Sequence, residues 1–376
     1  MVAIATVRAA NAAKAAAASA EPSGRPYVAV FAGGTSGIGE RAVRALASNH
    51  GPSAGPSRRP LRAYIIGRKQ AVADALMAEC AAACGPGGEF VFIKTEDLAM
   101  LRDVDAACAE IARLEEAASA REGHEAKIDL LVATQGVLYF GGRMDTSEGL
   151  DRHFSLMYYS RLRLVTNLLP LLTSLPSGSP SSTPGHVVSV FNPNLEGKLA
   201  ASDLSLRGAE NFGFVALSSH IALFTTFAFE ALAARHPGRL ALSHYYPGFV
   251  MTDIASKSPI PRWASLAWKL CTPVVKLFAV GDDDCGQYVD FLASGRYAAA
   301  RGGDQVEAAA AADSLEVAVG ADGGVGSGAY RVHWNGDIIQ PKKQTDAYRR
   351  DGMVEKVWEH TLAAFAAVDA GKAFDG

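Results

Sequence analysis

Ala32-Gly33-Gly34-Thr35-Ser36-Gly37-Ile38-Gly39 is the stretch that decides the fold. It follows an apolar run at residues 27–31 and leads into an amphipathic run at 40–47, which is the order strand, glycine-rich turn, helix. Glycines let the backbone approach a pyrophosphate, and the helix N-terminus offers that anion unpaired N–H groups and a positive dipole end. The stretch therefore predicts a dinucleotide-binding turn; the alternative is a glycine-rich turn with no ligand.

Apolar strand patterns alternate with helical patterns along the rest of the chain. One helical pattern opens at Asp97, the expected helix cap, and runs to about residue 120; the closing helix covers 345–367, with Trp358 and Phe365 facing the core. The expected strands cover residues 27–31, 61–66, 89–94, 128–132, 186–191, 240–245 and 329–333. The run at 128–132 is apolar throughout, as suits a parallel strand covered on both faces. We therefore predict an α/β fold, a Rossmann-type doubly wound parallel sheet.

The 376 residues suffice for one large domain, which we expect to be interrupted by insertions. Residues 1–26 form a helical or flexible lead-in, and residues 27–300 form the cofactor-binding domain with a Trp-bearing segment at 253–280. Residues 301–328 are a low-complexity Ala/Gly/Asp insertion. Residues 329–376 return to the same domain with a last strand and a closing helix.

Composition limits the classes of partner and the cellular compartment that we expect for this protein. The net charge of −3 argues against a nucleic-acid-binding surface, which requires clustered Lys and Arg. The five cysteines are scattered without metal-ligand spacing, so we expect no metal and a reducing, cytoplasmic location. No apolar run reaches the roughly 18–20 residues of a transmembrane helix.

The second expected strand ends in Gly67-Arg68-Lys69. In dinucleotide sites an acid at this position holds the ribose 2′-hydroxyl, whereas a basic residue suits a 2′-phosphate. Arg68, with Lys69, therefore points to NADP(H). The alternative is a solvent-exposed basic pair at the start of a helix.

The spacing Gly-x-x-x-Gly-x-Gly at 33–39 resembles the cofactor loop of short-chain dehydrogenases/reductases, with Ala32 where that family usually has Thr. The expected helix that begins at 146–151 and continues to about residue 172 resembles the retinol-dehydrogenase-like branch. Its Tyr-Tyr-Ser-Arg run at 158–161 is more closely similar to a fungal subgroup. The resemblance implies a set of cofactor-binding residues from the loop, the adenine side and the turn over the nicotinamide: Gly33, Thr35, Ser36, Gly37, Ile38, Gly39, Arg68, Lys69, Asp97, Leu98, Gly136, Pro247, Gly248 and Thr252.

The family's catalytic Asn, Ser, Tyr and Lys are all replaced. Alignment places Met157 at the Asn position, Asn192 at the Ser position (Phe191 if the register slips by one), Ala216 at the Tyr position and His220 at the Lys position. His220 is the strongest substitute, because imidazole titrates near neutrality; the alternative is a structural helix histidine.

Two further substitutes follow from these positions. Asn192 has an amide N–H₂ that can orient a carbonyl, and Tyr158 is a phenol near the cofactor, as are Tyr245 and Tyr246. Aromatic packing is the competing interpretation for each tyrosine. Met157 cannot hold a proton-relay water.

Three functions remain open on these observations. The first is an NADP(H)-dependent oxidoreductase of unusual mechanism; the second is a non-redox cyclase, isomerase or dehydratase; the third is an inactive NADP(H)-binding protein. Trp263 and Trp268 in the segment 253–280 favour a small-molecule substrate with a bulky hydrophobic group. The alternative is that this segment forms a dimer contact or a membrane-surface contact. The resemblance also implies a homodimer or tetramer and a role in fungal specialised metabolism.

Overall fold

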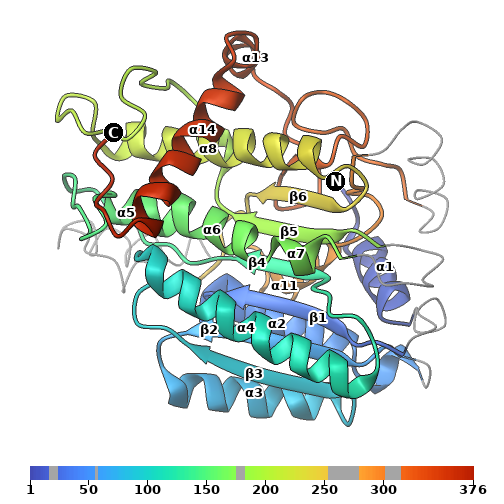
Figure 1. The fold of residues 1–376 in the computed structure, drawn as a ribbon. Helices are drawn as coiled ribbons and strands as arrows, with labels where there is room; N and C mark the ends of the chain where they lie inside the picture. Colours follow the sequence, from blue (N-terminus) through green and yellow to red (C-terminus); the bar gives the residue numbers. More distant parts are fainter. Residues whose placement is uncertain (17–23, 56–57, 175–182, 253–278, 301–314) are drawn as a thin grey trace, which may run out of the picture.

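A computed structural model describes residues 1–16, 24–55, 58–174, 183–252, 279–300 and 315–376. Its centre is one seven-stranded sheet with the strand order β3-β2-β1-β4-β5-β6-β7, and every neighbouring pair is parallel (Figure 1). The order reverses direction between β1 and β4, which is where an open α/β sheet forms its ligand crevice. The predicted doubly wound sheet is confirmed.

The strands match the expected apolar runs. They are β1 (Tyr27–Ala32), β2 (Leu61–Gly67), β3 (Gly88–Lys94), β4 (Leu130–Ala133), β5 (Gly185–Val190), β6 (Leu240–Tyr245) and β7 (Ala329–Val332). All of them except β3 are buried along their whole length. Helices cover both faces of the sheet, so these strands can be apolar on both sides.

Two helical layers enclose the sheet (Figure 1). One layer holds α1 (Ile4–Ala16), α2 (Gly37–Asn49), α3 (Gln70–Cys84) and α11 (Asp282–Phe291). The other holds α4 (Leu101–Glu122), α6 (Ser160–Asn167), α8 (Phe214–Arg235) and α14 (Met353–Asp369). Each layer builds its own apolar cluster against the sheet.

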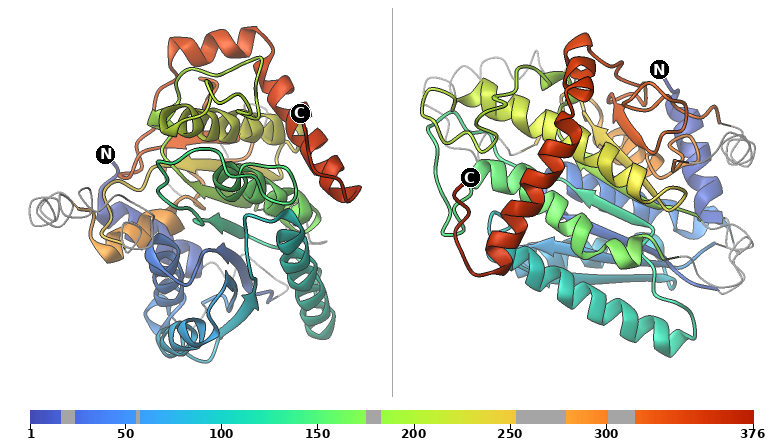
Figure 2. Two further views of the ribbon diagram at one scale, coloured as in Figure 1. Left: turned by 90° about the vertical axis from the view of Figure 1, so that its left-hand side faces the viewer. Right: turned by 45° about the horizontal axis from the view of Figure 1, so that its top comes forward.

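The closing helix differs from the prediction. The structure has two helices, α13 (Lys343–Arg350) and α14, because Gly352 between them adopts a positive φ of 71°. Figure 2 shows α14 lying across the outside of α8. Trp358 and Phe365 on α14 are buried in the core, as expected.

The helix expected from residue 146 to 172 is also divided. It begins at α5 (Arg152–Phe154), continues as a π-helix (Ser155–Tyr159) and α6, and ends with α7 (Leu169–Leu172). The long helix expected from Asp97 begins at Leu101 instead. Glu148, in the loop before α5, accepts hydrogen bonds from the backbone N–H groups of Leu101 (2.7 Å) and Arg102 (3.1 Å) and so takes the capping role expected of Asp97.

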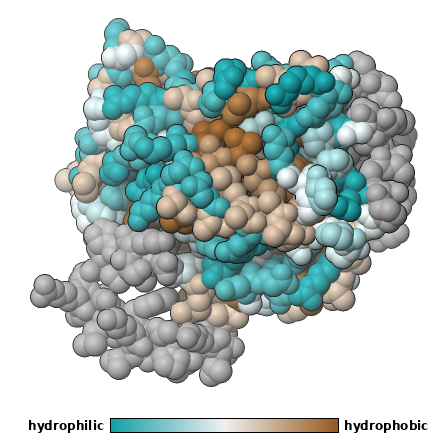
Figure 3. Space-filling model, turned by 90° about the horizontal axis from the view of Figure 1, so that it is seen from below, coloured by the Kyte–Doolittle hydropathy of each residue, from teal (hydrophilic) through white to brown (hydrophobic). Residues whose placement is uncertain are grey.

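The sheet edge at β3 carries an apolar surface. Seen from this side, hydrophobic residues gather at the centre of the molecule among hydrophilic ones (Figure 3), and Phe90, Val91 and Phe92 on β3 are only partly buried.

Helix α8 is long and apolar enough to cross a membrane by length and composition, but 83% of its apolar stretch is buried inside the protein. We therefore describe α8 as a core helix.

An ionic cluster lies at the edge of the sheet where β1 and β4 begin. Asp129 is 3% exposed, and its carboxylate accepts two hydrogen bonds from Arg25 (2.8 and 3.0 Å) and one from Arg59 (3.1 Å). It also accepts the backbone N–H of Val28 at 2.9 Å. Asp129 is buried, which raises its pKa, but Arg59 and Arg25 outweigh that effect and hold the pKa well below its usual range.

Two segments singled out in the sequence fall largely outside the described residues. These are the Trp-bearing segment, of which 253–278 is not described, and the low-complexity insertion, of which 301–314 is not described. Within the described part of the chain, Cys80, Cys84, Cys108 and Cys285 are unpaired and buried. The cytoplasmic location stays a prediction.

Candidate active site

The glycine-rich turn is shaped by close backbone packing. Gly33 and Gly37 have positive φ values of 78° and 60°. A Cβ on Gly39 would lie 2.4 Å from the carbonyl oxygen of Gly33 and 2.6 Å from the Thr134 hydroxyl, so no larger residue fits there. Ser36 caps α2 without a side-chain hydrogen bond, which leaves the first N–H groups of α2 available to an anion.

A cavity of about 490 Å³ opens at this turn, along the carboxyl ends of the central strands. Most of the predicted cofactor-binding residues line it: Gly33, Thr35, Ser36, Gly37, Ile38, Arg68, Asp97, Leu98, Gly136 and Thr252. The other lining residues were not in the predicted set: Ile66, Gly67, Thr95, Thr134, Gln135, Val137, Tyr139, Met144, Arg152, His153 and Leu156. The glycines that a Cβ would block and the open end of α2 fit a dinucleotide.

Four predicted cofactor-binding residues do not line the cavity. Gly39 lies behind the turn against Gly33, where it permits the close packing of helix and strand. Lys69 is exposed at the start of α3. Gly248 has a positive φ of 73° and packs against Trp334, and Pro247 precedes it in the same turn after β6.

Thr134 supplies hydrogen bonds that support the turn. Its hydroxyl lies 3.0 Å from the carbonyl oxygen of Ala32 and 3.2 Å from that of Gly33, and it donates to this pair of acceptors. Thr134 and Gln135 follow β4 where the resembled family usually has two Asn residues. For Thr134 the contact to the glycine turn is present; Gln135 instead donates to the Ser160 hydroxyl at 3.2 Å.

The cavity has a basic residue at the end of β2. Arg68 is exposed there, and no acidic side chain pairs with it in the described part of the chain. Asp97, also on the wall, forms an ion pair with Arg152 at 2.7 Å and accepts the N–H of Ala99 at 3.0 Å. Asp97, the acid among the described lining residues, is thus already partnered, so Arg68 is available to a phosphate.

Met157 lies beneath the cavity floor. Its Sδ is 3.7 Å from the position of a Cβ on Gly136. Arg161, on the following turn, donates to the carbonyl oxygens of Val190 (2.8 Å) and Gln135 and so joins the ends of β4 and β5. Burial lowers the pKa of Arg161 to about 9. No local sequence pattern predicts this structural role of Arg161.

His220 is not on the cavity wall. It is 1% exposed, its Nδ1 bonds to the carbonyl oxygen of Ala216 at 2.9 Å, and its Nε2 accepts the N–H of Ala200 at 3.2 Å. Burial lowers the pKa of this imidazole. Both ring nitrogens are occupied by backbone groups, so His220 is enclosed in this structure; its catalytic role stays a prediction.

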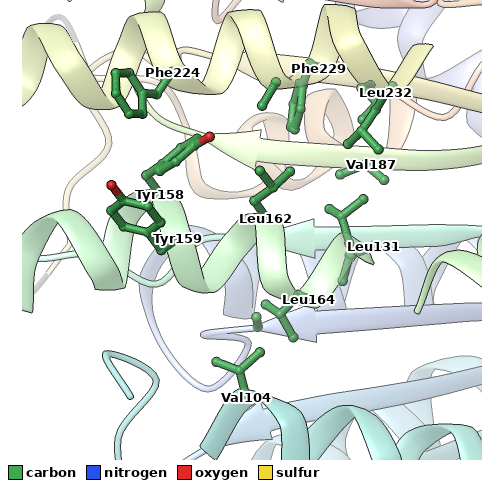
Figure 4. Packing of buried hydrophobic residues seen from close by; sticks show 14 of the residues in the cluster. Val104, Leu131, Tyr158, Tyr159, Leu162, Leu164, Val187, Phe224, Phe229 and Leu232 are labelled. Atoms are coloured by element: carbon green, nitrogen blue, oxygen red, sulfur yellow. The ribbon is translucent and has the colours of Figure 1, made fainter. Parts of the chain in front are cut away.

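Tyr158 is likewise part of the core. Figure 4 shows its ring directed from the π-helix toward Phe224 on α8, and its hydroxyl bonds to Thr361 at 2.6 Å. Burial raises the pKa of Tyr158 well above its usual value. Tyr245 is also fully buried, and Tyr246 packs edge-on against His333. The aromatic-packing interpretation therefore holds for Tyr158 and Tyr245.

Asn192 caps a short 3₁₀ helix (Pro193–Leu195) after β5. Its side-chain oxygen accepts hydrogen bonds from the backbone and side-chain N–H groups of Asn194, both at 2.9 Å. Asn192 does not line the cavity. Tyr158 and His220 both pack against Phe154 and Phe224 in the core, and none of Asn192, Tyr158 and His220 lines the cavity.

The structure places a different pair on the cavity wall. The rings of Tyr139 and His153 are stacked, with centroids 3.6 Å apart and planes 9° from parallel. Tyr139 comes from the loop after β4 and His153 from α5. No local motif predicts that Tyr139 and His153 meet. The sequence offers one signal for His153, which is its position four residues before Met157.

Comparison with known proteins identifies the family. No family model matches the chain. The chain is 34% identical over 346 residues to the short-chain dehydrogenase/reductase SAT2 of Stachybotrys chartarum, covering 91% of this chain and 92% of that protein. The chain belongs to the short-chain dehydrogenase/reductase family. It is also 35% identical to the oxidoreductase AN1596 of Emericella nidulans, over 89% of this chain and 91% of that protein.

Solved structures with this fold were found at low sequence identity. They include a Pseudomonas aeruginosa RhlG/NADP active-site complex, 18% identical with a TM-score of 0.48, covering 72% of this chain and 90% of that one. An NADPH-bound carbonyl reductase from chicken fatty liver is 14% identical, also with a TM-score of 0.48, over 84% and 99%. The family membership, which rests on the two fungal relatives, shows that the chain is an oxidoreductase of the short-chain dehydrogenase/reductase type.

Proposed function

We propose that this protein is an NADP(H)-dependent oxidoreductase that acts on a bulky hydrophobic carbonyl or alcohol. The observation that carries the proposal is the cavity itself, which joins the glycine turn of β1 and α2 to Arg68 at the end of β2. The backbone of the turn would hold the pyrophosphate, and Arg68 would hold the 2′-phosphate. Bound NADPH supplies a hydride to the substrate carbonyl carbon.

Apolar side chains beside the cavity support the substrate class. Met144, on the wall, is 48% exposed. Phe140, next to the wall residue Tyr139, is 53% exposed and stacks on Phe214 at the start of α8, with ring centroids 4.6 Å apart. Exposed apolar groups of this size beside a pocket favour an aromatic or otherwise bulky hydrophobic ligand.

The proposed biological setting rests on the relatives. SAT2 and AN1596 are fungal proteins. The role in fungal specialised metabolism that we propose rests on the sequence resemblance. A homodimer or tetramer is the assembly we propose on that resemblance.

Nicotinamide absorbance tests the function. The purified protein is expected to oxidise NADPH in the presence of at least one of phenanthrenequinone, menadione, acetophenone or an aromatic polyketide-like ketone. Tight NADPH binding without oxidation by any of them would favour an inactive binding protein. Substrate conversion that continues unchanged without nicotinamide would favour the non-redox alternative.

Cofactor preference depends on Arg68. The change Arg68→Ala is expected to weaken NADPH binding by about 10- to 100-fold, because a charge-assisted hydrogen bond to phosphate contributes roughly 1.5–3 kcal/mol. NADH binding should change little, since NADH has no 2′-phosphate. Fluorescence titration with both nucleotides measures the ratio, and Arg102→Ala, an exposed arginine that does not line the cavity, is the matched control. Equal losses for the two nucleotides would contradict this role of Arg68.

A further inference from the structure

His153 is held rigidly on the cavity wall by its neighbours. It is 6% exposed, and Tyr139 covers one face of its ring at 3.6 Å. The hydroxyl of Tyr139 donates to the carbonyl oxygen of Gly142 at 2.7 Å. The Nδ1 atom of His153 is buried and has no hydrogen-bond partner within the described ranges.

A carboxylate lies beside that nitrogen. Asp151 Oδ1 is 4.0 Å from His153 Nδ1. The carboxylate is locked in place: Oδ1 accepts the N–H groups of His153 (3.0 Å) and Phe154 (2.9 Å), and Oδ2 accepts the N–H of Met144 (2.9 Å). A fixed negative charge at this distance stabilises an imidazolium when one forms.

His153 lies close in the sequence to one of the replaced catalytic positions. It lies four residues before Met157, which occupies the position of the family's catalytic Asn. The π-helix starts directly after α5 and includes Met157; such distortions are frequent at functional sites. His153 is thus a titratable group on the cavity wall, whereas Ala216 has no proton to give and His220 is enclosed.

We propose that His153 is the catalytic acid of the reductase, and that Tyr139 and Asp151 are positioning residues. The inference rests on the proposed function. When the carbonyl is reduced, its carbon receives the hydride of NADPH, which becomes NADP⁺, and its oxygen receives the proton of the His153 imidazolium. The π bond of the C=O group breaks, the C–O single bond remains, and new C–H and O–H bonds form. The neutral imidazole left behind regains its proton from water. In the alcohol-oxidising direction the neutral ring accepts the hydroxyl proton.

The charges around His153 set the direction of its pH dependence. Burial lowers the pKa of His153, Asp151 opposes that shift, and Arg152 adds to it. Because the imidazolium exists below this pKa, the rate of ketone reduction should fall as the pH rises through the lowered value. The rate of alcohol oxidation should rise over the same interval.

Chemical labelling tests the position of His153 without any turnover. Diethyl pyrocarbonate is expected to modify His153 in the ligand-free protein, as read by peptide mass spectrometry, and saturating NADP⁺ should slow that modification about tenfold because a bound ligand buries the cavity wall. Unchanged labelling of His153 with and without NADP⁺ would overturn the inference, since the ring would then lie outside the occupied cavity.

Substitution tests its chemistry. The change His153→Gln is expected to lower kcat for ketone reduction about 100-fold and leave the Kd for NADPH within about threefold. The matched control is His236→Gln, at the end of α8 and away from the cavity lining, which should leave kcat unchanged. Tyr139→Ala should lower kcat about tenfold, and Tyr139→Phe, which keeps the stacked ring, should restore it.

The outcomes separate the two proposals. Full kcat in His153→Gln, with NADPH oxidation intact in the unchanged protein, would overturn only the role of His153. Absence of NADPH oxidation in the unchanged protein would overturn the reductase function and this role with it. If His153→Gln also loses NADPH binding, its loss of activity reflects disruption of the cavity, and the catalytic role is contradicted.

Discussion

The change Gly39→Ala is expected to weaken NADPH binding by at least about 100-fold. The added methyl would lie 2.4 Å from the carbonyl oxygen of Gly33 and 2.6 Å from the Thr134 hydroxyl, so backbone would have to move. Movement of the turn displaces the N–H groups that face the pyrophosphate. Loss of two charge-assisted hydrogen bonds, at roughly 1.5–3 kcal/mol each, accounts for a change of that size.

Isothermal titration with NADPH measures the effect, and Gly213→Ala is the matched control. Gly213 precedes α8 in extended backbone, and nothing lies within 4 Å of a Cβ placed on it. The control should bind NADPH normally and keep its melting temperature. Normal NADPH affinity in Gly39→Ala would contradict the assignment of the turn as the pyrophosphate site.

The largest expected loss of stability comes from Asp129→Asn. The change leaves the guanidinium groups of Arg25 and Arg59 buried without their carboxylate. Removing one partner of a buried ionic cluster costs about 3–5 kcal/mol, because the remaining charges stay desolvated. Urea unfolding at neutral pH, analysed by linear extrapolation, gives the difference. A difference below about 1 kcal/mol would show that the cluster contributes little.

The same cluster predicts how acid affects stability. The pKa of Asp129 is depressed in the folded protein, so its contribution is fully present above the unfolded value of about 4 and is lost as the pH falls from there toward the folded value. The gap between the unchanged protein and Asp129→Asn should therefore narrow below about pH 4. Glu110→Gln, which removes an exposed pair with Arg113, should show no measurable change at any of these pH values.

The sheet was predictable because its signals are local. Each strand is a short apolar run, and the glycine turn follows the first of them directly. The errors in helix boundaries came from distant contacts. Glu148 caps α4 from a loop about 50 residues further along the chain, and no local pattern around Asp97 reveals that contact.

The site was predictable in its cofactor half only. A backbone that approaches a pyrophosphate closely requires glycine, so the glycines within residues 33–39 are enough to predict a cofactor-binding turn. The catalytic half depends on which side chains reach the cavity. His220 has the right chemistry in the aligned position, but Ala200, from a separate segment, binds its Nε2. Tyr139 and His153 meet across a loop of irregular backbone, which sequence periodicity does not describe.

A crystal structure of the protein with NADP⁺ tests the central claim most directly. We predict density for the pyrophosphate at the turn of residues 33–39, for the 2′-phosphate beside Arg68, and for the nicotinamide ring in the cavity that His153 lines. A nucleotide bound outside this cavity, or a 2′-phosphate with no contact to Arg68, would contradict the account.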